Sequence, residues 1–229
     1  MNRILVVAAH PDDEILGCGA TMSKLSEQKN EIHILILGEG ITSRHNLCNS
    51  NEMKAELENL QLEAKNAAKI IGANSIEFVN FPDNRFDSVS LLDIIKAVEK
   101  KKNELKPQIV FTHHAHDLNI DHQRTFQAVL TSCRPMKNET VREIYSFEIP
   151  SSTEWQFQSA MNVFLPTQYF TISEKHLIAK ISAMNVYSSE IRDYPHPRSL
   201  KALRLLAEYR GVTVGEKYAE GFVVVRKII

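Results

Sequence analysis

Short apolar runs alternate with segments of helical periodicity in the first half of the chain. The runs are rich in β-branched side chains, which predicts buried strands over residues 4–9, 32–37, 76–81 and 108–112. Between them, apolar side chains recur at helical spacing, which predicts helices over residues 14–28, 52–71 and 90–105. This regular alternation favours a parallel sheet with helices on both faces.

The second half of the chain has fewer regular patterns. It predicts the end of a strand at 145–150, an amphipathic helix over 199–210 and a last strand over 222–225. No linker rich in Pro, Gly or Ser and no block of like charges divides the 229 residues. We therefore predict one domain over residues 1–229, a three-layer, doubly wound, Rossmann-like α/β fold with a mostly parallel sheet.

Charge and cysteine content limit the function classes. The chain carries 27 basic and 28 acidic residues, so it has no general attraction to nucleic acid or to anionic membranes. Its three cysteines form no C-x-x-C pair, which suits a reducing cytosol better than a disulfide framework. The N-terminal apolar run is too short for a signal peptide or a membrane span. We expect a cytoplasmic protein without nucleic-acid partners, and the sequence leaves a homo-oligomer open.

Polar side chains follow the first predicted strand directly: His10, Asp12, Asp13 and Glu14. Pro11 disfavours the helical conformation at His10, so a turn must precede the next helix. In one interpretation Asp12 caps that helix, and the next two acids complement its dipole. In the other, a histidine and carboxylates form a ligand site at the carboxyl end of the strand, where open α/β sheets bind their ligands.

A second polar cluster favours the ligand site. Residues 113–122, HHAHDLNIDH, hold four histidines and two aspartates directly after the fourth predicted strand. In doubly wound sheets the first and fourth strands commonly adjoin, so we expect both clusters to meet in one crevice. Neutral imidazole and carboxylate together suit zinc, and three protein ligands leave a position for water in a catalytic site. The absence of paired cysteines argues against a closed structural zinc site.

The combination of His10-Pro11-Asp12-Asp13-Glu14 with Asp121-His122 resembles the motifs of the PIG-L/LmbE family of zinc-dependent N-acetylglucosaminyl deacetylases. The resemblance extends over most of the chain, although residues 140–200 match only loosely. It includes Gly38-Glu39-Gly40, residues 117–122, Arg210-Gly211 and residues 219–222. It implies a hydrolase of amide C–N bonds, with Zn²⁺ as cofactor. The implied substrate is a small conjugate or a glycan precursor that carries an N-acetyl amino sugar.

The resemblance also implies a role for each site residue. His10, Asp13 and His122 would bind the zinc ion. Asp12 would be the general base that takes a proton from water, and Asp121 would hydrogen-bond a neighbouring histidine and fix its tautomer.

Several family members stabilise the oxyanion with a histidine at the position of Asn119 in this chain. We expect His116 to take this role, with His113 and His114 as alternatives. For the substrate we expect Arg44, Asp83 and Asn84 to bind sugar hydroxyls or a phosphate, although each is also explained as an ordinary polar loop residue. Trp155 is the only tryptophan. We expect its ring in the core rather than stacked on a sugar.

Three other functions compete with this interpretation. A dinucleotide-binding oxidoreductase would share the fold, but the acidic turn would repel a pyrophosphate where glycine amides are needed. A zinc amidase for a different acyl group would use the same constellation and stays open. A non-catalytic sugar-binding protein of the same fold would not need the base, so the presence of Asp12 speaks against it.

Overall fold

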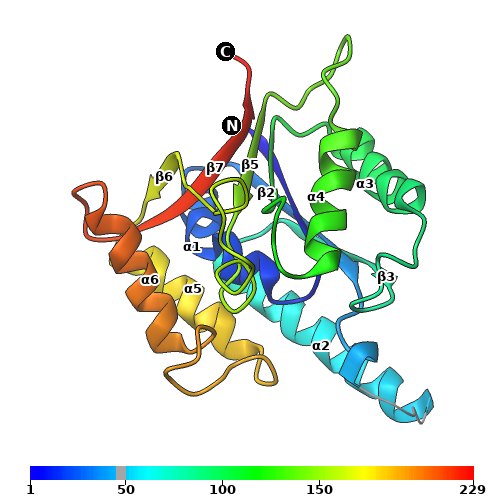
Figure 1. The fold of residues 1–229 in the computed structure, drawn as a ribbon, viewed down its shortest axis with the longest axis horizontal. Helices are drawn as coiled ribbons and strands as arrows, with labels where there is room; N and C mark the ends of the chain where they lie inside the picture. The colour runs from blue at the N-terminus through cyan, green and yellow to red at the C-terminus, as the bar shows by residue number, and fades with distance from the viewer. Residues whose placement is uncertain (45–49) are drawn as a thin grey trace.

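The computed structural model describes residues 1–44 and 50–229, without the side chains of residues 44, 50 and 51. Within these residues, seven strands form one sheet in the order β3-β2-β1-β4-β5-β7-β6 (Figure 1). The strands are β1 (Arg3–Ala8), β2 (Glu31–Gly38), β3 (Ser75–Phe81), β4 (Ile109–His113), β5 (Glu143–Phe147), β6 (Gln168–Thr171) and β7 (Ala219–Lys227).

The sheet is parallel from β3 through β5, with β1 paired between β2 and β4. Ile4 is in register with Ile32 on one side and with Ile109 on the other. Strand β7 runs in the opposite direction and pairs antiparallel with β5 on one side and with β6 on the other. The predicted α/β class, with a mostly parallel sheet and adjacent first and fourth strands, is confirmed.

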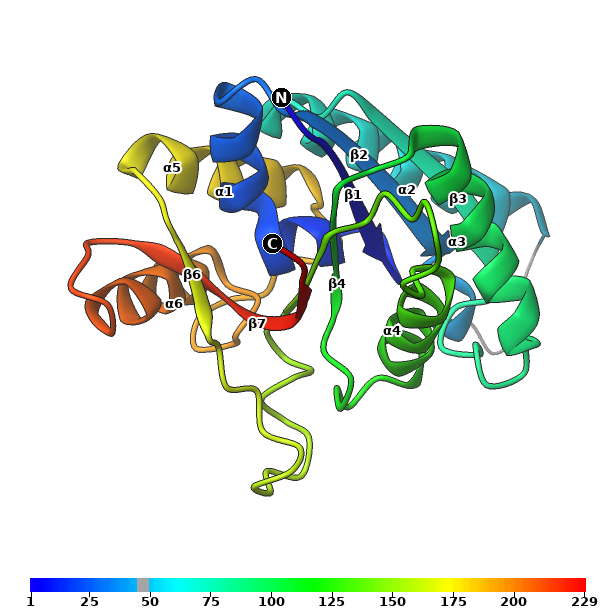
Figure 2. The same cartoon turned by 90° about the horizontal axis from the view of Figure 1, so that it is seen from above.

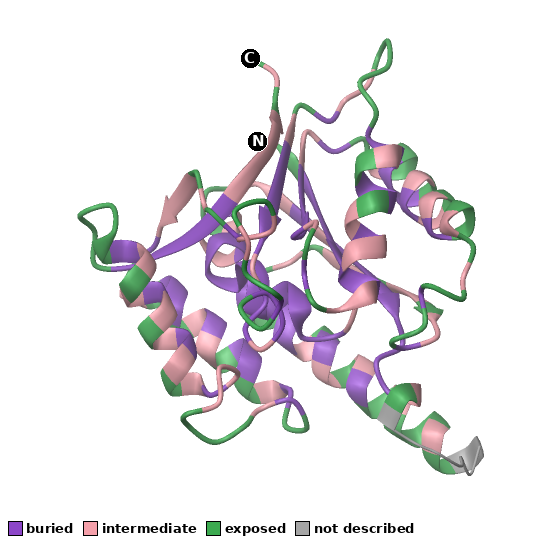
Figure 3. Cartoon of the chain, in the orientation of Figure 1, coloured by how far each residue is buried: buried purple, intermediate pink, exposed green. Residues whose placement is uncertain are grey.

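Six helices among the described residues cover the two faces of this sheet (Figures 1 and 2). They are α1 (Asp13–Glu27), α2 (Ser50–Ile71), α3 (Leu91–Leu105), α4 (Ile120–Ser132), α5 (Glu174–Val186) and α6 (Leu200–Val212). Side chains alternate across β1, so Ile4, Val6 and Ala8 pack with α1, α2 and α5. Leu5 and Val7 pack with α3 and α4 on the other face. Both faces of the central strand are therefore core, which explains its unbroken apolar sequence (Figure 3).

The start of α1 is pressed against the sheet. A Cβ atom added at Gly17 would lie 2.4 Å from Cδ2 of Phe147 on β5, so only glycine permits this approach. The helix is also irregular at Cys18, where φ is −148° and ψ is 22°. Close packing thus fixes the first turn of α1, which carries Asp13 and Glu14, at the carboxyl end of β1.

The sequence patterns missed three elements, namely α4, α5 and β6, and the expected burial of Trp155 is wrong. Its side chain is 54% exposed in the connection between β5 and β6, where the ring lies 5.6 Å from that of His196. Figure 2 shows this connection projecting beyond the body of the molecule, on the side of the loop between β4 and α4. No helix among the described residues has both the length and the apolar character that a membrane span needs.

Candidate active site

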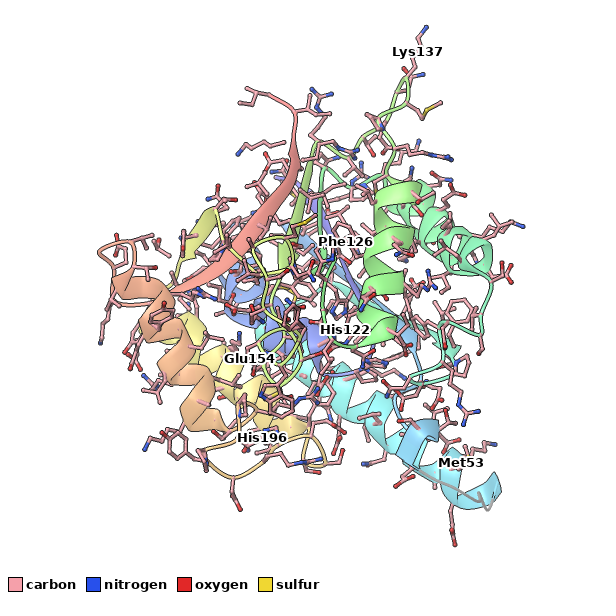
Figure 4. All side chains as sticks on the ribbon, viewed as in Figure 1. Met53, His122, Phe126, Lys137, Glu154 and His196 are labelled. Carbon is pink, nitrogen blue, oxygen red and sulfur yellow. The ribbon has the colours of Figure 1, made fainter. Side chains whose placement is uncertain are left out.

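The two polar clusters meet at the carboxyl ends of β1 and β4. His10 Nε2 lies 2.9 Å from Asp121 Oδ2, and His122 Nε2 lies 3.2 Å from Asp13 Oδ2. Because β1 and β4 are hydrogen-bonded neighbours, residues far apart in the sequence share one crevice. Figure 4 labels His122 at the start of α4, with Glu154 and His196 in two of the loops on the same side of the molecule.

Asp12 occupies a strained turn between β1 and α1. Its φ of 107° is rare for a residue with a side chain and costs on the order of 1–3 kcal/mol. Its carbonyl accepts hydrogen bonds from the amides of Ile15 and Leu16, but its carboxylate makes no helix-capping bond. The backbone N–H of Asp12 donates to Glu14 Oε2 at 3.1 Å. The capping interpretation required a hydrogen bond from the helix to the carboxylate of Asp12. Because no such bond forms, this carboxylate stays available for another role.

His10, Asp13 and His122 present nitrogen and oxygen atoms to one point. Their ligand atoms lie within 4.8 Å of one another, and all three residues are buried or nearly so. Asp13 Oδ1 is buried and has no hydrogen-bond partner among the described residues. A buried, unpartnered carboxylate oxygen is costly unless something positive contacts it. Two imidazoles and one carboxylate are a donor set that zinc prefers, so these residues fit a bound zinc ion.

Carboxylates behind the histidines orient both rings. The Nε2–H of His10 points to Asp121 and to Asp83, whose Oδ1 is 3.1 Å away, so Nδ1 faces Asp13 at 3.3 Å. Asp121 is held in turn because its Oδ1 accepts the N–H of Phe86 at 2.9 Å. Asp121 thus accepts a hydrogen bond from a histidine, as expected, and a carboxylate placed in this way fixes the tautomer of a metal-binding histidine.

A second carboxylate, Asp117, supports His122. Its Oδ1 lies 3.0 Å from His122 Nδ1, and hydroxyl groups of Ser152 and Thr153 donate to it. Sequence reasoning gave Asp117 no role, although its place in the histidine-rich run was a visible signal. Asp117 thus links the β5–β6 connection to a predicted metal ligand.

The electrostatics of the site attract positive charge. Burial lowers the pKa of His122, but Asp13 and Asp117 outweigh burial and raise this pKa to about 9. Burial also opposes protonation of His10, and hydrogen bonds to Asp121, Asp13 and Asp83 raise its pKa well above the usual value. The carboxylates thus favour positive charge at this point of the site.

The three histidines considered for the oxyanion lie outside the pocket. His113 is fully buried, and its Nε2 accepts the N–H of Ala9 at 2.8 Å. His114 Nε2 lies 3.1 Å from the carbonyl oxygen of Asn162. His116, the expected residue, is exposed, and its ring is 5.8 Å from that of His114. The structure does not bring His116 together with the other site residues, because the loop turns it outward before Asp117 points back in.

A polar pocket of about 380 Å³ opens beside the predicted ligands. Its lining residues are His10, Pro11, Asp12, Gly40, Ser43, Asp83, Asn84, Asn119, Glu190 and Arg198. Asn84 Nδ2 donates to Ser43 Oγ at 3.1 Å, and Asn119 Nδ2 donates to Asn84 Oδ1 at 2.9 Å. Asp83 and Asn84, expected at the substrate, do line the pocket. Arg44 ends the short 3₁₀ helix Thr42–Arg44, and its side chain lies outside the described part of the chain.

Arg198 is a charged pocket residue to which sequence reasoning gave no role. Its Nη1 donates to Asp12 Oδ2 at 2.9 Å and lies 3.7 Å from Glu190 Oε2, while its Nε donates to Ser151 Oγ at 2.8 Å. Burial raises the pKa of Asp12 well above its usual value, and the charge of Arg198 opposes that rise. The available signal in the sequence was the turn before Arg198, which is bracketed by Pro195 and Pro197. The residue after Arg198, Ser199, caps α6, because its Oγ accepts the N–H of Ala202.

Known proteins are similar to this chain in sequence and in fold. The PIG-L family profile, described as GlcNAc-PI de-N-acetylase, matches residues 5–133. YaiS from Escherichia coli K12, described as an uncharacterized deacetylase, is 29% identical over 191 residues, which cover 81% of this chain and 90% of YaiS.

Two solved structures have similar folds. The N,N'-diacetylchitobiose deacetylase from Pyrococcus horikoshii has a TM-score of 0.78 at 20% identity, over 98% of this chain and 84% of that protein. GalB, the 4-carboxy-2-hydroxymuconate hydratase from Pseudomonas putida, has a TM-score of 0.77 at 22% identity, over 100% of this chain and 98% of GalB. The fold thus occurs with two reactions. Since the family match spans more than half of the sequence and contains both polar clusters of the site, this chain belongs to the PIG-L family.

Proposed function

We propose that this protein is a zinc-dependent hydrolase that removes the acetyl group from an N-acetyl amino sugar conjugate or glycan precursor. The observation that carries the proposal is that two adjacent carboxylates have different positions in the site. Asp13 joins two histidines at a point that fits a metal ion, while Asp12 faces the pocket and pairs with Arg198. A carboxylate beside the metal but not bound to it can act as the general base for the attacking water. Membership of the PIG-L family supports the same reaction.

His10, Asp13 and His122 would hold the zinc ion. When bound, zinc supplies a Lewis acid that polarises the acetyl carbonyl and lowers the pKa of water to about 7. Asp12 takes a proton from the attacking water while the oxygen of that water bonds to the acetyl carbon. Asp12 then returns that proton to the nitrogen as the C–N bond breaks. The products are acetate and the free amino sugar, and Asp117 and Asp121 keep the two histidines oriented throughout.

The pocket beside Asp12 would receive the sugar. Asp83 and Asn84 offer acceptors and donors that match hydroxyl groups, and Arg44 is proposed to contact a hydroxyl or a phosphate. The Pyrococcus horikoshii protein of the same fold is a deacetylase of diacetylchitobiose, which is consistent with a sugar substrate here. A cytoplasmic location and a homo-oligomer stay predictions from the sequence.

A different acyl group is the main alternative, because the same residues would hydrolyse it. The test measures acetate release from free, lipid-linked and nucleotide-linked N-acetyl sugars, with and without a chelator. Simple acetylated amines of similar size serve as controls. We expect acetate from the sugars at a rate more than tenfold that of the simple amines, equivalent to about 1.4 kcal/mol, and loss of activity with the chelator. Equal rates on both classes would contradict the sugar assignment, and activity that survives chelation would contradict the metal.

A further inference from the structure

The pocket lacks the histidine donor that the sequence led us to expect for the oxyanion. Asn119 Oδ1 accepts the N–H of Asp121 at 2.8 Å, and one of the two N–H groups on its Nδ2 donates to Asn84. His113 is engaged with the backbone behind the site, and His116 is exposed. Amide hydrolysis still places negative charge on the acetyl oxygen in the tetrahedral intermediate. Zinc would stabilise part of that charge by polarising the carbonyl, and a fixed hydrogen-bond donor on the other side of the oxygen would stabilise the rest.

Arg198 is positioned to be that donor. It lies at the pocket with its side chain 23% exposed, and its Nη1 is 2.9 Å from the carboxylate of Asp12. Within the described residues, the nitrogen Nη2 has no hydrogen-bond partner. A base contacts the attacking water, and the acetyl carbon is the next atom beyond that water. A guanidinium fork on the base can therefore donate a second N–H to the acetyl oxygen.

We propose that Arg198 is a catalytic residue whose guanidinium stabilises the oxyanion of the tetrahedral intermediate. This inference rests on the proposed deacetylation. As Asp12 takes the proton from water, its own charge is neutralised and negative charge appears on the acetyl oxygen. The guanidinium of Arg198 is fixed beside Asp12. It therefore lies next to the negative charge before the proton transfer, when the charge is on Asp12, and after it, when the charge is on the acetyl oxygen.

Arg198 is held in place before substrate binds. Its backbone N–H donates to His196 Nδ1 at 3.1 Å, and the next residue, Ser199, caps α6. Its side chain is tied to Ser151 from the β5–β6 connection and lies near Glu190 from the α5–α6 connection. Donors fixed in this way stabilise a transition state without reorganisation during the reaction.

The kinetic test compares Arg198→Ala and Arg198→Lys with the wild type on an N-acetyl sugar substrate. Loss of an oxyanion donor typically lowers kcat about 10²–10³-fold, and we expect this loss in Arg198→Ala with KM nearly unchanged. Guanidinium ion at low concentration should restore part of the activity of Arg198→Ala, whereas urea should not. Arg192→Ala is the matched control, because Arg192 is exposed in the same connection and its Nη1 donates to the carbonyls of Ser189 and Ile191.

A binding measurement separates this proposal from the proposed function. The probe is a methylphosphonamidate of glucosamine, in which tetrahedral phosphorus replaces the acetyl carbon. Calorimetry should show that Arg198→Ala binds it about 10²–10³-fold more weakly than wild type, with zinc content and melting temperature unchanged. If Arg198→Ala does not fold, the affinity of Arg198→Lys for the probe is compared with that of wild type instead. Equal affinity for the probe, or a loss confined to KM, would overturn the role of Arg198. Absence of acetate release by the wild type would instead overturn the proposed function.

Discussion

His10 Nε2 and Asp121 Oδ2 lie 2.9 Å apart, although 111 residues separate them in the sequence. The contact joins the turn after β1 to the first turn of α4. It orients the ring so that His10 Nδ1 faces Asp13. A hydrogen bond of this kind orients a metal-binding imidazole and increases its basicity. The two halves of the site are thus tied together by a carboxylate that does not belong to the proposed ligand set.

Asp121→Asn should weaken zinc binding without removing the site. Loss of such a supporting carboxylate typically costs about 10–100-fold in metal affinity or activity. Competition with a chromogenic chelator measures the affinity directly. Asp87→Asn is the control, because Asp87 is exposed on the loop that follows Asp83. If Asp121→Asn binds zinc as tightly as wild type, the hydrogen bond to His10 does not prepare the ligand.

Zinc should stabilise the folded protein through His122. A ligand that binds only the native state at about 100 times its dissociation constant adds about 2.7 kcal/mol to the free energy of unfolding. The melting temperature of wild type should therefore rise when zinc is added, and that of His122→Ala should not. His33→Ala is the control, since His33 lies on β2 and bonds to Ser75. A zinc-dependent rise in His122→Ala equal to that of wild type would exclude His122 as a ligand.

The partly buried ion pair of Lys102 and Glu139 predicts a pH-dependent stability. Lys102 Nζ donates to Glu139 Oε2 at 2.6 Å and to the carbonyl of Ser132 at 2.8 Å. Burial favours the neutral acid, but the bond from Lys102 outweighs it and lowers the pKa of Glu139. A carboxyl group whose pKa is lower in the folded state stabilises the fold above its unfolded pKa of about 4.3. That contribution disappears as the pH falls through the folded value.

Glu139→Gln should therefore lower the free energy of unfolding at neutral pH by about 1.5–3 kcal/mol, the contribution of a hydrogen bond to a charged group. The difference from wild type should shrink as the pH falls from about 4.3 through the lower pKa of the folded state, below which Glu139 is protonated in both states. Urea unfolding at neutral pH and at a series of acidic pH values measures this difference. A difference that stays constant with pH would show that the charge of Glu139 is not what stabilises the fold.

The sequence predicted the sheet and the central part of the site because local patterns encode them. Apolar runs mark β1 and β4, and the doubly wound order places their polar ends in one crevice, so His10, Asp13 and His122 were expected to meet. Helix α4 was missed because its first residues were interpreted only as part of the histidine-rich loop. Strand β6 is a short edge strand of half-buried residues, which gives little apolar signal.

Arg198 is an example of a contact that local sequence patterns do not predict. Its contact with Asp12 spans 186 residues and depends on how the α5–α6 connection folds back over the turn after β1. The exposed position of His116 depends likewise on the path of the loop between β4 and α4. Residue type and spacing identify which side chains are chemically able to act, and only the packing of loops decides which of them reach the pocket.

The central claim is that Asp13 binds the metal and that Asp12 acts on water beside it. Metal content and kcat, measured together on Asp12→Asn and Asp13→Asn, test it most directly. The account predicts that Asp12→Asn keeps one zinc ion per chain and loses about 10²–10⁴-fold in kcat, the contribution of a general base. Asp13→Asn should lose the zinc ion itself. Loss of zinc in Asp12→Asn, with zinc retained in Asp13→Asn, would contradict the account.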